Sequence, residues 1–401
     1  MKRLMILGGS RYILPVIDAA HRSGCHVITC DYLPGNIAHR YSDEYCNVSI
    51  IEQDAVLQAA QKLRIDGIMS FACDPGVVTA AYVAEKMKLP SVGSYEAVSI
   101  LQNKGKFRKF LSEHGFNAPV SKSYKTAGQA LGETGLFHWP VIVKPTDSAG
   151  SKGVTRVDDP DQLKESIAHA LSYSPGKEFI IEDYLQQKGF SSDTDSFSVN
   201  GKMQLINFNC QRFDEKAENR YVPAAYSWPA GISERHQKEL SSEIRRLISL
   251  LELQSSVYNI ETRECTDGKS YIMECSPRGG GNRLSEMIRY TAGADLITNA
   301  VKAALGEPCD AIIEKPDNGF WAIIILHSNT GGIFEGLEIS GDIRKYIIEE
   351  AVWAEPGTRV DPFSAANNTI GTMILHAGRQ EEIDEILNHQ NKYIRIKVKN
   401  A

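Results

Sequence analysis

Residues 256–283 read SVYNIETRECTDGKSYIMECSPRGGGNR and give the clearest indication of the fold. Two strand-like runs flank the turn Thr266-Asp267-Gly268-Lys269, so this stretch predicts a β-hairpin. Glu261 ends the first run and Glu274 lies on the second, and hairpin pairing brings the two carboxylates side by side. Such carboxylates repel each other unless a cation lies between them, and oxygen ligands favour Mg²⁺ or Mn²⁺ over zinc. The alternative is a surface salt-bridge pair.

The residues that follow Glu274 extend the same pattern. Ser276 points to the same side of the strand as Glu274, because it lies two residues further on. Arg278 is placed where it could clamp a phosphoryl oxygen, and the glycines at 279–281 allow close approach of the backbone to a ligand. A plain loop would also explain the glycine run, but not the ordered succession of all these residues.

A second candidate segment is the apolar strand Val141–Lys144 and the loop after it. A lysine at the end of a buried strand is costly without a partner. The loop 147–153 is rich in small residues and joins two strands, so it is not a Walker loop, which enters a helix. Backbone N–H groups of such a loop can close over a polyphosphate while the lysine supplies positive charge. An ordinary hairpin with a solvated Lys152 is the equally supported alternative.

The rest of the chain indicates two further units. The first hundred residues alternate strands and helices, which predicts a parallel sheet with helices on both faces; strands are expected at 3–7, 26–31, 67–71 and 91–93. Gly8-Gly9-Ser10 lacks the full dinucleotide-binding spacing, so a nicotinamide dehydrogenase is disfavoured. The last ninety residues alternate short strands and turns before a final helix and strand, which predicts a small α+β module.

Composition excludes several classes of protein. The 401 residues carry 44 Lys and Arg against 50 Asp and Glu, a net charge of −6 that disfavours nucleic-acid binding. The longest apolar stretch, Trp321 to Leu326, is far shorter than a membrane span, and the N-terminal apolar run is too short for a signal peptide. None of the eight cysteines has zinc-finger or C-x-x-C spacing. We therefore expect reduced thiols in a cytoplasmic protein.

Taken in order, these segments resemble the ATP-grasp enzymes over nearly the whole chain. The resemblance implies a Rossmann-like pre-ATP-grasp domain over 1–98, an ATP-grasp domain over 99–309 with a lid at about 119–204, and a C-terminal α+β domain over 310–401. Gly357–Phe363 with Ile370-Gly371 resembles the last domain of the biotin-carboxylase and purine-biosynthesis branches. The fold class implied is α/β with α+β.

The resemblance also implies roles for single residues. ATP is expected to be bound by the helix pair, the lid and the strand end after 181, through Lys104, Lys144, Ser148, Gly150, Ser151, Gly153, Glu182, the carbonyl of Asp183 and the N–H of Leu185. Mg²⁺ or Mn²⁺ is expected on Glu261, Glu274 and Ser276, where serine replaces the usual asparagine, with Lys144 and Arg278 as catalytic charges. The acid that usually binds ribose is missing near Lys188-Gly189, and Asp193 or Asp195 could replace it.

The activity implied is a carboxylate–amine ligase that forms an acyl phosphate and transfers it to a nucleophile. Candidate contacts to its small-molecule carboxylate and amine are Arg283, Asn282, Arg212 and Tyr226, and a homodimer is possible. Two alternatives stay open: a bicarbonate-activating carboxylase of the same fold, and a nucleotide-binding regulatory protein without turnover. Bicarbonate-dependent ATP hydrolysis and ADP release separate the three.

Overall fold

The computed structural model describes residues 1–148, 150–313, 315 and 319–399. The N-terminal unit contains a four-stranded parallel sheet of order β3-β2-β1-β4, as predicted. Its strands are β1 (Arg3–Leu7), β2 (His26–Cys30), β3 (Glu44–Cys46) and β4 (Gly67–Ser70). Its helices are α1 (Leu14–Arg22), α2 (Gln53–Leu63) and α3 (Val77–Met87).

One expected strand, at 91–93, is absent from this sheet. The segment forms a local turn instead, because the Ser91 hydroxyl donates to the Gly93 carbonyl at 2.7 Å. The carbonyl of Val92 accepts from the backbone N–H of Gln254. Its backbone groups therefore have partners outside any ladder.

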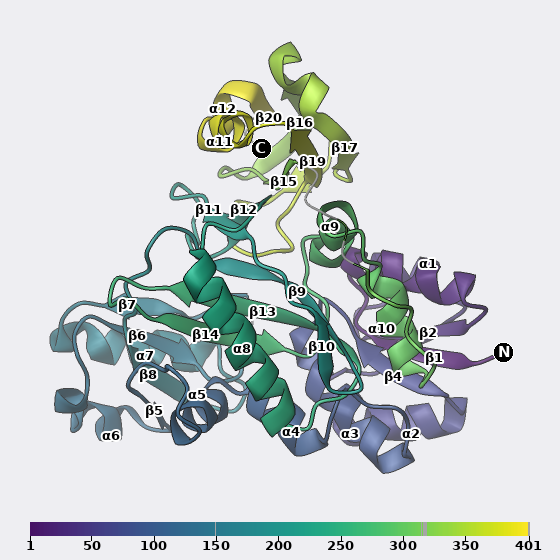
Figure 1. The fold of residues 1–401 in the computed structure, drawn as a ribbon, viewed down its shortest axis with the longest axis horizontal. Coiled ribbons are helices and arrows are strands. Elements are labelled where there is room, and N and C mark those ends of the chain that lie inside the picture. Colours follow the sequence, from purple (N-terminus) through teal and green to yellow (C-terminus); the bar gives the residue numbers. More distant parts are fainter. Residues whose placement is uncertain (149, 314, 316–318, 400–401) are drawn as a thin grey trace.

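Four antiparallel strands form a separate sheet of order β5-β8-β6-β7 at the left of Figure 1. They are β5 (Ser121–Tyr124), β6 (Val141–Pro145), β7 (Thr155–Val157) and β8 (Phe179–Asp183), with α6 (Ala127–Leu131) and α7 (Leu163–Ser172) packed on them. Two strands inside the range proposed for the lid, β9 (Ser192–Val199) and β10 (Lys202–Leu205), belong to another sheet. The proposed lid domain thus contains one complete sheet that ends at residue 183.

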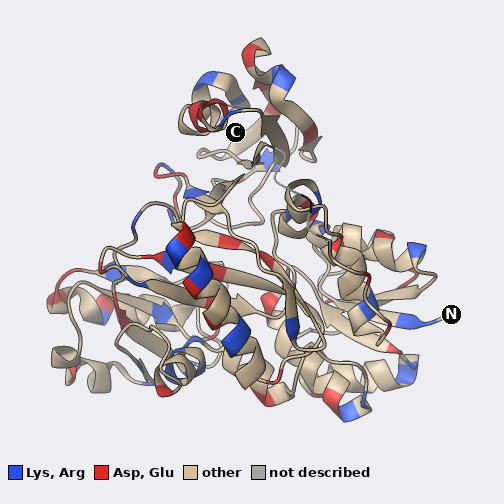
Figure 2. Ribbon diagram, in the orientation of Figure 1, with Lys and Arg blue, Asp and Glu red and all other residues tan. Residues whose placement is uncertain are grey.

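The central sheet has the order β10-β9-β13-β14 and contains the predicted hairpin of β13 (Ser256–Glu264) and β14 (Ser270–Ser276). Helix α8 (Glu234–Leu250) crosses this sheet (Figure 1). Its apolar face, which includes Leu240, Ile244 and Leu247, is buried against Tyr258 and Ile260. Figure 2 shows acidic and basic residues mixed along the same helix. The 3.6-residue period of the apolar positions explains this placement.

The remaining strands form two sheets at the C-terminal end. One has the order β11-β12-β15-β19-β17, and the other has the order β18-β16-β20. The strands are β11 (Cys210–Phe213), β12 (Pro223–Trp228), β15 (Phe320–Leu326), β16 (Gly332–Ile339), β17 (Ile347–Val352), β18 (Arg359–Val360), β19 (Gly371–Ala377) and β20 (Ile394–Lys399). The helices α11 (Gln380–Asn388) and α12 (Gln390–Tyr393) pack beside them, and α4 (Tyr95–Gln102) and α5 (Lys104–Glu113) lead into the lid. No helix among the described residues is long and apolar enough to cross a membrane.

The N-terminal sheet is covered by a helix from much later in the chain. After α9 (Leu284–Thr291), α10 (Leu296–Ala304) packs on α1 and β4. Ile297 and Val301 share one core with Leu4 and Ile6. The close approach requires glycine at position 67, because a Cβ there would lie 2.4 Å from the Ala304 carbonyl oxygen. Helix α10 and the N-terminal sheet are therefore packed as one unit.

The contact at Gly67 gives a test of this packing. Gly67→Ala must displace α10 from β4, so we expect the free energy of unfolding to fall by about 1–3 kcal/mol, measured by chemical denaturation. Gly35→Ala is the matched control, because a Cβ at Gly35 meets no atom within 4 Å. Equal stability of the two variants would contradict the described packing of α10.

Candidate functional site

A cavity of about 480 Å³ opens between the lid sheet, the central sheet and the N-terminal unit. Its floor is formed by β13 and β14, and its other walls carry residues of β6, β8, α5 and the loop after β4. Most of the predicted site residues line it: Lys104, Lys144, Ser148, Gly150, Ser151, Glu182, Asp183, Leu185, Tyr226, Glu261, Glu274, Arg278 and Asn282. Segments from Tyr12 to Ala366 thus meet at one place.

The floor of the cavity carries two rows of polar side chains across three neighbouring strands. In the first row Asp193 of β9 lies opposite Glu261 of β13, which lies opposite Glu274 of β14. In the second row, two residues along, Asp195 lies opposite Asn259, which lies opposite Ser276. Because side chains two residues apart point to the same side of a strand, both rows face the same way. The predicted pairing of Glu261 with Glu274 is present in this register.

The first row contains two carboxylates with basic partners and one without. The Nζ of Lys104 lies 3.4 Å from Glu274 Oε1, and Arg263 Nη2 lies 3.1 Å from Glu261 Oε1. Lys104 lowers the pKa of Glu274 from its ordinary value. Asp193 accepts only from neutral donors, and burial together with the charge of Glu261 raises its pKa to about 7. The row therefore holds a local excess of negative charge.

A divalent cation would neutralise this excess of negative charge. Among the described residues, no group of three or more His, Cys, Asp and Glu is arranged as a complete metal site. Mg²⁺ often takes only one or two protein carboxylates and completes its shell with phosphate and water. Glu261 and Glu274 therefore fit an ion that arrives with a phosphorylated ligand.

The second row is held by the N-terminal unit. Arg278 makes a two-bond contact with Asp74, from Nε to Oδ1 and from Nη2 to Oδ2, both at 2.8 Å. The Ser276 hydroxyl donates to the same carboxylate at 3.0 Å and accepts from Gln102. Ser276 is buried and, unlike Glu261 and Glu274, does not line the cavity. Asp195 is fully buried and accepts from the Gly280 N–H.

On the lid side, a buried carboxylate joins two cations. Glu182 accepts from Lys144 Nζ and, at 2.9 Å, from Arg108 Nε, and all three side chains are nearly inaccessible. Burial opposes the ionised form of Glu182, but Arg108 and Lys144 outweigh it and hold its pKa at about 2. Burial lowers the pKa of Lys144 below its ordinary value, and Arg108 contributes to this effect, although Glu182 opposes it. Lys144 is thus a desolvated cation at the cavity wall.

The loop expected to cover phosphates lies above this wall. Residue 149 lies outside the described residues, and Gly150, Ser151 and Gly153 have positive φ values of 68°, 57° and 72°. Lys104 Nζ donates to the Ser148 carbonyl at 2.9 Å, and the Ser151 hydroxyl donates to the Tyr221 carbonyl at 3.1 Å. Gly153 is buried against Tyr173 and Pro145 and does not line the cavity.

The end of β8 provides the expected backbone edge. The Asp183 carboxylate accepts from the backbone and the ring of His138, at 2.9 and 2.8 Å, so its side chain is directed into the lid. Asp183, Tyr184 and Leu185 line the cavity. Within the described part of the chain, the N–H of Leu185 has no hydrogen-bond acceptor. An adenine ring could use such a group.

The structure separates the four candidate substrate contacts into two pairs. Tyr226 and Asn282 line the cavity. Arg283 instead contacts Glu286 and Glu349, at 2.9 and 2.8 Å. Arg212 contacts Asp384 and Asn388 of α11 and lines a different cavity. Arg283 therefore connects the start of α9 to β17, whereas Arg212, on β11, connects the C-terminal sheet to α11.

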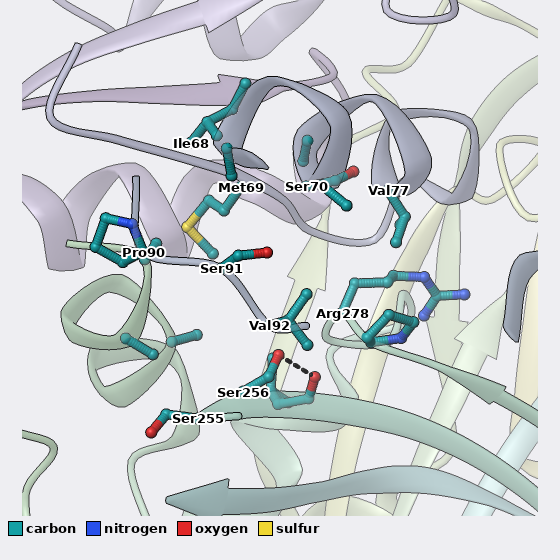
Figure 3. A pocket seen from close by; sticks show the side chains of 18 residues that line it. Ile68, Met69, Ser70, Val77, Pro90, Ser91, Val92, Ser255, Ser256 and Arg278 are labelled. Atoms are coloured by element: carbon teal, nitrogen blue, oxygen red, sulfur yellow. Dashed lines mark hydrogen bonds between the residues drawn. The ribbon is translucent and has the colours of Figure 1, made fainter. Parts of the chain in front are cut away.

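A small second cavity lies on the other side of Arg278. Figure 3 shows it between Met69, Val77, Pro90 and Val92, with the charged end of Arg278 directed away from these side chains. Its volume of about 50 Å³ is far below that of a small-molecule pocket. It is a packing gap between the N-terminal unit and the central sheet.

Sequence reasoning did not identify Asp74, Arg108 or Asn259 as part of the site. Asp74 follows β4, and ligands of parallel sheets gather at the carboxyl ends of strands, so its position was a usable signal. Asp193 and Asp195, which alternate on β9, were predicted only as replacements for the ribose-binding acid. Arg108 has no local signal, because its partner Glu182 lies 74 residues away.

The buried cluster around Glu182 predicts a pH-dependent stability. Its pKa is about 2 against an ordinary 4.5, so its stabilisation is complete above about pH 4.5 and is lost as the pH falls toward 2. Glu182→Gln leaves Lys144 and Arg108 without an anion, and we expect it to cost about 3–5 kcal/mol at pH 7. Denaturation curves between pH 2.5 and 7 should show a weaker pH dependence for this variant. Glu113→Gln, at the exposed pair with Lys109, is the control and should behave like the wild type.

Comparisons with known proteins agree with this geometry. Residues 137–286 match the family model of the ATP-grasp domain. A formate-dependent phosphoribosylglycinamide formyltransferase of Bacteroides thetaiotaomicron is 24% identical over 392 residues, 96% of each chain. A carbamoyl phosphate synthase large chain of Thermotoga petrophila is 25% identical over 249 residues, 62% of this chain and 22% of that one. The chain therefore spans about a fifth of the length of such large chains.

Solved structures share the fold over the whole chain. An L-amino acid ligase from Bacillus licheniformis has a TM-score of 0.81 at 20% identity, with 100% of this chain and 99% of that chain covered. An N5-carboxyaminoimidazole synthetase from Staphylococcus aureus, complexed with ADP, has a TM-score of 0.75 at 15% identity, with 96% of both chains covered. The matched residues 137–286 include the strand of Lys144 and the Glu261–Glu274 hairpin, so this part of the chain is an ATP-grasp domain.

Proposed function

We propose that this protein is an ATP- and Mg²⁺-dependent ligase that activates a substrate carboxylate as an acyl phosphate and transfers the acyl group to an amine. One observation carries the proposal. The same cavity presents two buried-strand carboxylates, Glu261 and Glu274, opposite two cations, Lys104 and Lys144. Carboxylates for a metal and lysines for phosphates within one cavity are the requirements of phosphoryl transfer.

The lining residues divide according to the parts of Mg²⁺-ATP. The backbone edge Asp183–Leu185 suits the adenine, while Lys104, Lys144 and the loop around Ser148 and Ser151 suit the phosphates. Glu261 and Glu274 would hold the metal. When bound, Mg²⁺ neutralises charge on the transferring phosphoryl group. Lys144 would exchange some of its contact with Glu182 for a phosphate oxygen, and Arg108 would keep Glu182 paired.

Arg278 is placed to act on the transferred group. Its Nη1 donates to Asn259 and to the Gly279 carbonyl, and its Nε and Nη2 donate to Asp74. One N–H of Nη2 is left for a ligand, because a guanidinium has five donors. A charge held this rigidly needs little reorganisation when negative charge develops on a phosphoryl oxygen.

The reaction proceeds in two substitutions. A carboxylate oxygen attacks the γ-phosphorus, the bond from that phosphorus to the bridging oxygen breaks, and ADP leaves with the electron pair. The amine nitrogen then attacks the acyl carbon, the carbon–oxygen bond to phosphate breaks, and inorganic phosphate leaves. The protein aligns the reactants and stabilises charge, so no nucleophilic side chain is required.

The proposal is tested by ADP release with Mg²⁺-ATP and pooled carboxylates, bicarbonate included, with and without pooled amines. We expect release that requires a carboxylate and rises with amine. Glu274→Gln should lower the rate at least 100-fold at saturating ATP, because the metal loses a charged ligand, and its melting temperature should stay near that of the wild type. Glu261→Gln should be milder. The exposed change Glu96→Gln is the control.

Two outcomes would contradict the proposed ligase. Release that depends on bicarbonate alone would assign the protein to carboxylation. Tight ATP binding without release under any condition would indicate a regulatory nucleotide-binding protein. Wild-type turnover by Glu274→Gln would show that the metal assignment is wrong.

A further inference from the structure

Asp193 differs from the other acidic side chains of the cavity in its charge environment. Glu182 contacts Lys144 and Arg108, Glu261 contacts Arg263, Glu274 contacts Lys104, and Asp74 contacts Arg278. Asp183 contacts the ring of His138. Across the described ranges, no lysine, arginine or histidine lies within ion-pair distance of Asp193. It is thus a carboxylate that lines a ligand cavity without a basic partner.

Neutral donors fix the orientation of this carboxylate. Asn259 Nδ2 donates to Oδ1 at 2.8 Å, while Gln211 Nε2 and the Tyr226 hydroxyl donate to Oδ2 at 3.3 and 3.2 Å. The two amides are themselves oriented: Gln211 Oε1 accepts from Ser191 at 2.8 Å, and Asn259 Oδ1 accepts from Arg278 at 3.0 Å. The carboxylate is therefore held in place before any ligand binds.

The hydrogen-bond count leaves room for one donor. Each carboxylate oxygen accepts about two hydrogen bonds. Oδ2 has two donors and Oδ1 has one, so one acceptor position remains on Oδ1. That remaining position suits a single N–H. Asp193 is also opposite Glu261 in the register, which places it beside the proposed metal and phosphate site.

We propose that Asp193 binds the amine nucleophile by accepting one of its N–H groups, with Gln211 and Tyr226 as positioning residues. This inference rests on the proposed ligase function and names the part of the site that recognises the second substrate. The ligand class is an aliphatic amine or an amino acid. Its nitrogen would approach the acyl phosphate from the β9 side of the cavity.

This placement also assists the second substitution. As the nitrogen–carbon bond forms and the carbon–oxygen bond to phosphate breaks, positive charge develops on the nitrogen. Asp193 lies where it would stabilise that charge, and the extra proton leaves the nitrogen with the departing phosphate. The interaction is stronger in the transition state than with the free amine, which is the condition for catalysis.

The test separates carboxylate activation from amine recognition. Acyl phosphate is trapped with concentrated hydroxylamine, which reacts without needing a specific site, and is measured as hydroxamate. In a second measurement, the rate of product formation is determined at increasing concentrations of the amine found in the ADP-release screen. For Asp193→Asn we expect kcat/KM for the amine to fall about 10-fold or more beyond any change in hydroxamate formation. Tyr226→Phe, which keeps the carboxylate, should show a smaller effect in the same direction. Asp18→Asn, on the exposed face of α1, is the matched control.

Any other result contradicts either the amine-binding role of Asp193 or the proposed ligase function. Equal loss of hydroxamate and of amine product would assign Asp193 to the metal or to ATP, and unchanged amine kinetics would remove it from the site. If Asp193→Asn does not fold, hydroxamate formation and amine kinetics are compared for Tyr226→Phe instead, and unchanged amine kinetics of that variant would contradict the proposal. If the wild type forms no hydroxamate with any carboxylate, the proposed function itself fails, and the amine site fails with it.

Discussion

Three neighbouring strands place acidic side chains in one row, and the repulsion between these side chains must be offset by positive charge from the rest of the site. Alternation along β9, β13 and β14 directs Asp193, Glu261 and Glu274 to the same face, and their register sets them opposite one another. Such a row is unfavourable without positive charge nearby. One cation, Arg263, lies on β13 itself, and the other, Lys104, begins α5. The site is therefore formed only when the lid, the central sheet and the connecting helices are assembled.

The N-terminal unit contributes Asp74 to the charged groups of the site. Its carboxylate holds both Arg278 and Ser276, so the loop after β4 fixes the two side chains that end the central hairpin. The same unit is fastened to the core by α10, which covers its sheet. A displacement of the N-terminal unit would thus alter the direction of Arg278. This coupling explains why a residue 204 positions from Arg278 belongs to the proposed phosphoryl-transfer site.

Local patterns predicted more of the fold than of the site. The βαβα alternation, the period of α8 and the Thr266–Lys269 turn each specify an element by itself, and all three were confirmed. The pairing of Glu261 with Glu274 follows from one short hairpin. The pairing of β9 with β13, the Arg108–Glu182 contact and the Arg283–Glu349 contact join distant segments, and no local pattern contains that information. Arg283 was predicted to contact the substrate because of the glycines before it. Its contact with Glu349 depends on the position of β17, which is set by the C-terminal sheet.

A structure with Mg²⁺ and a non-hydrolysable ATP analogue tests the central claim most directly. We expect the adenine to lie against Asp183–Leu185, the triphosphate between Lys104 and Lys144, and the metal on Glu261 and Glu274. Nucleotide bound elsewhere, for example at the carboxyl edge of the N-terminal sheet, or a triphosphate without metal at these two glutamates, would contradict it.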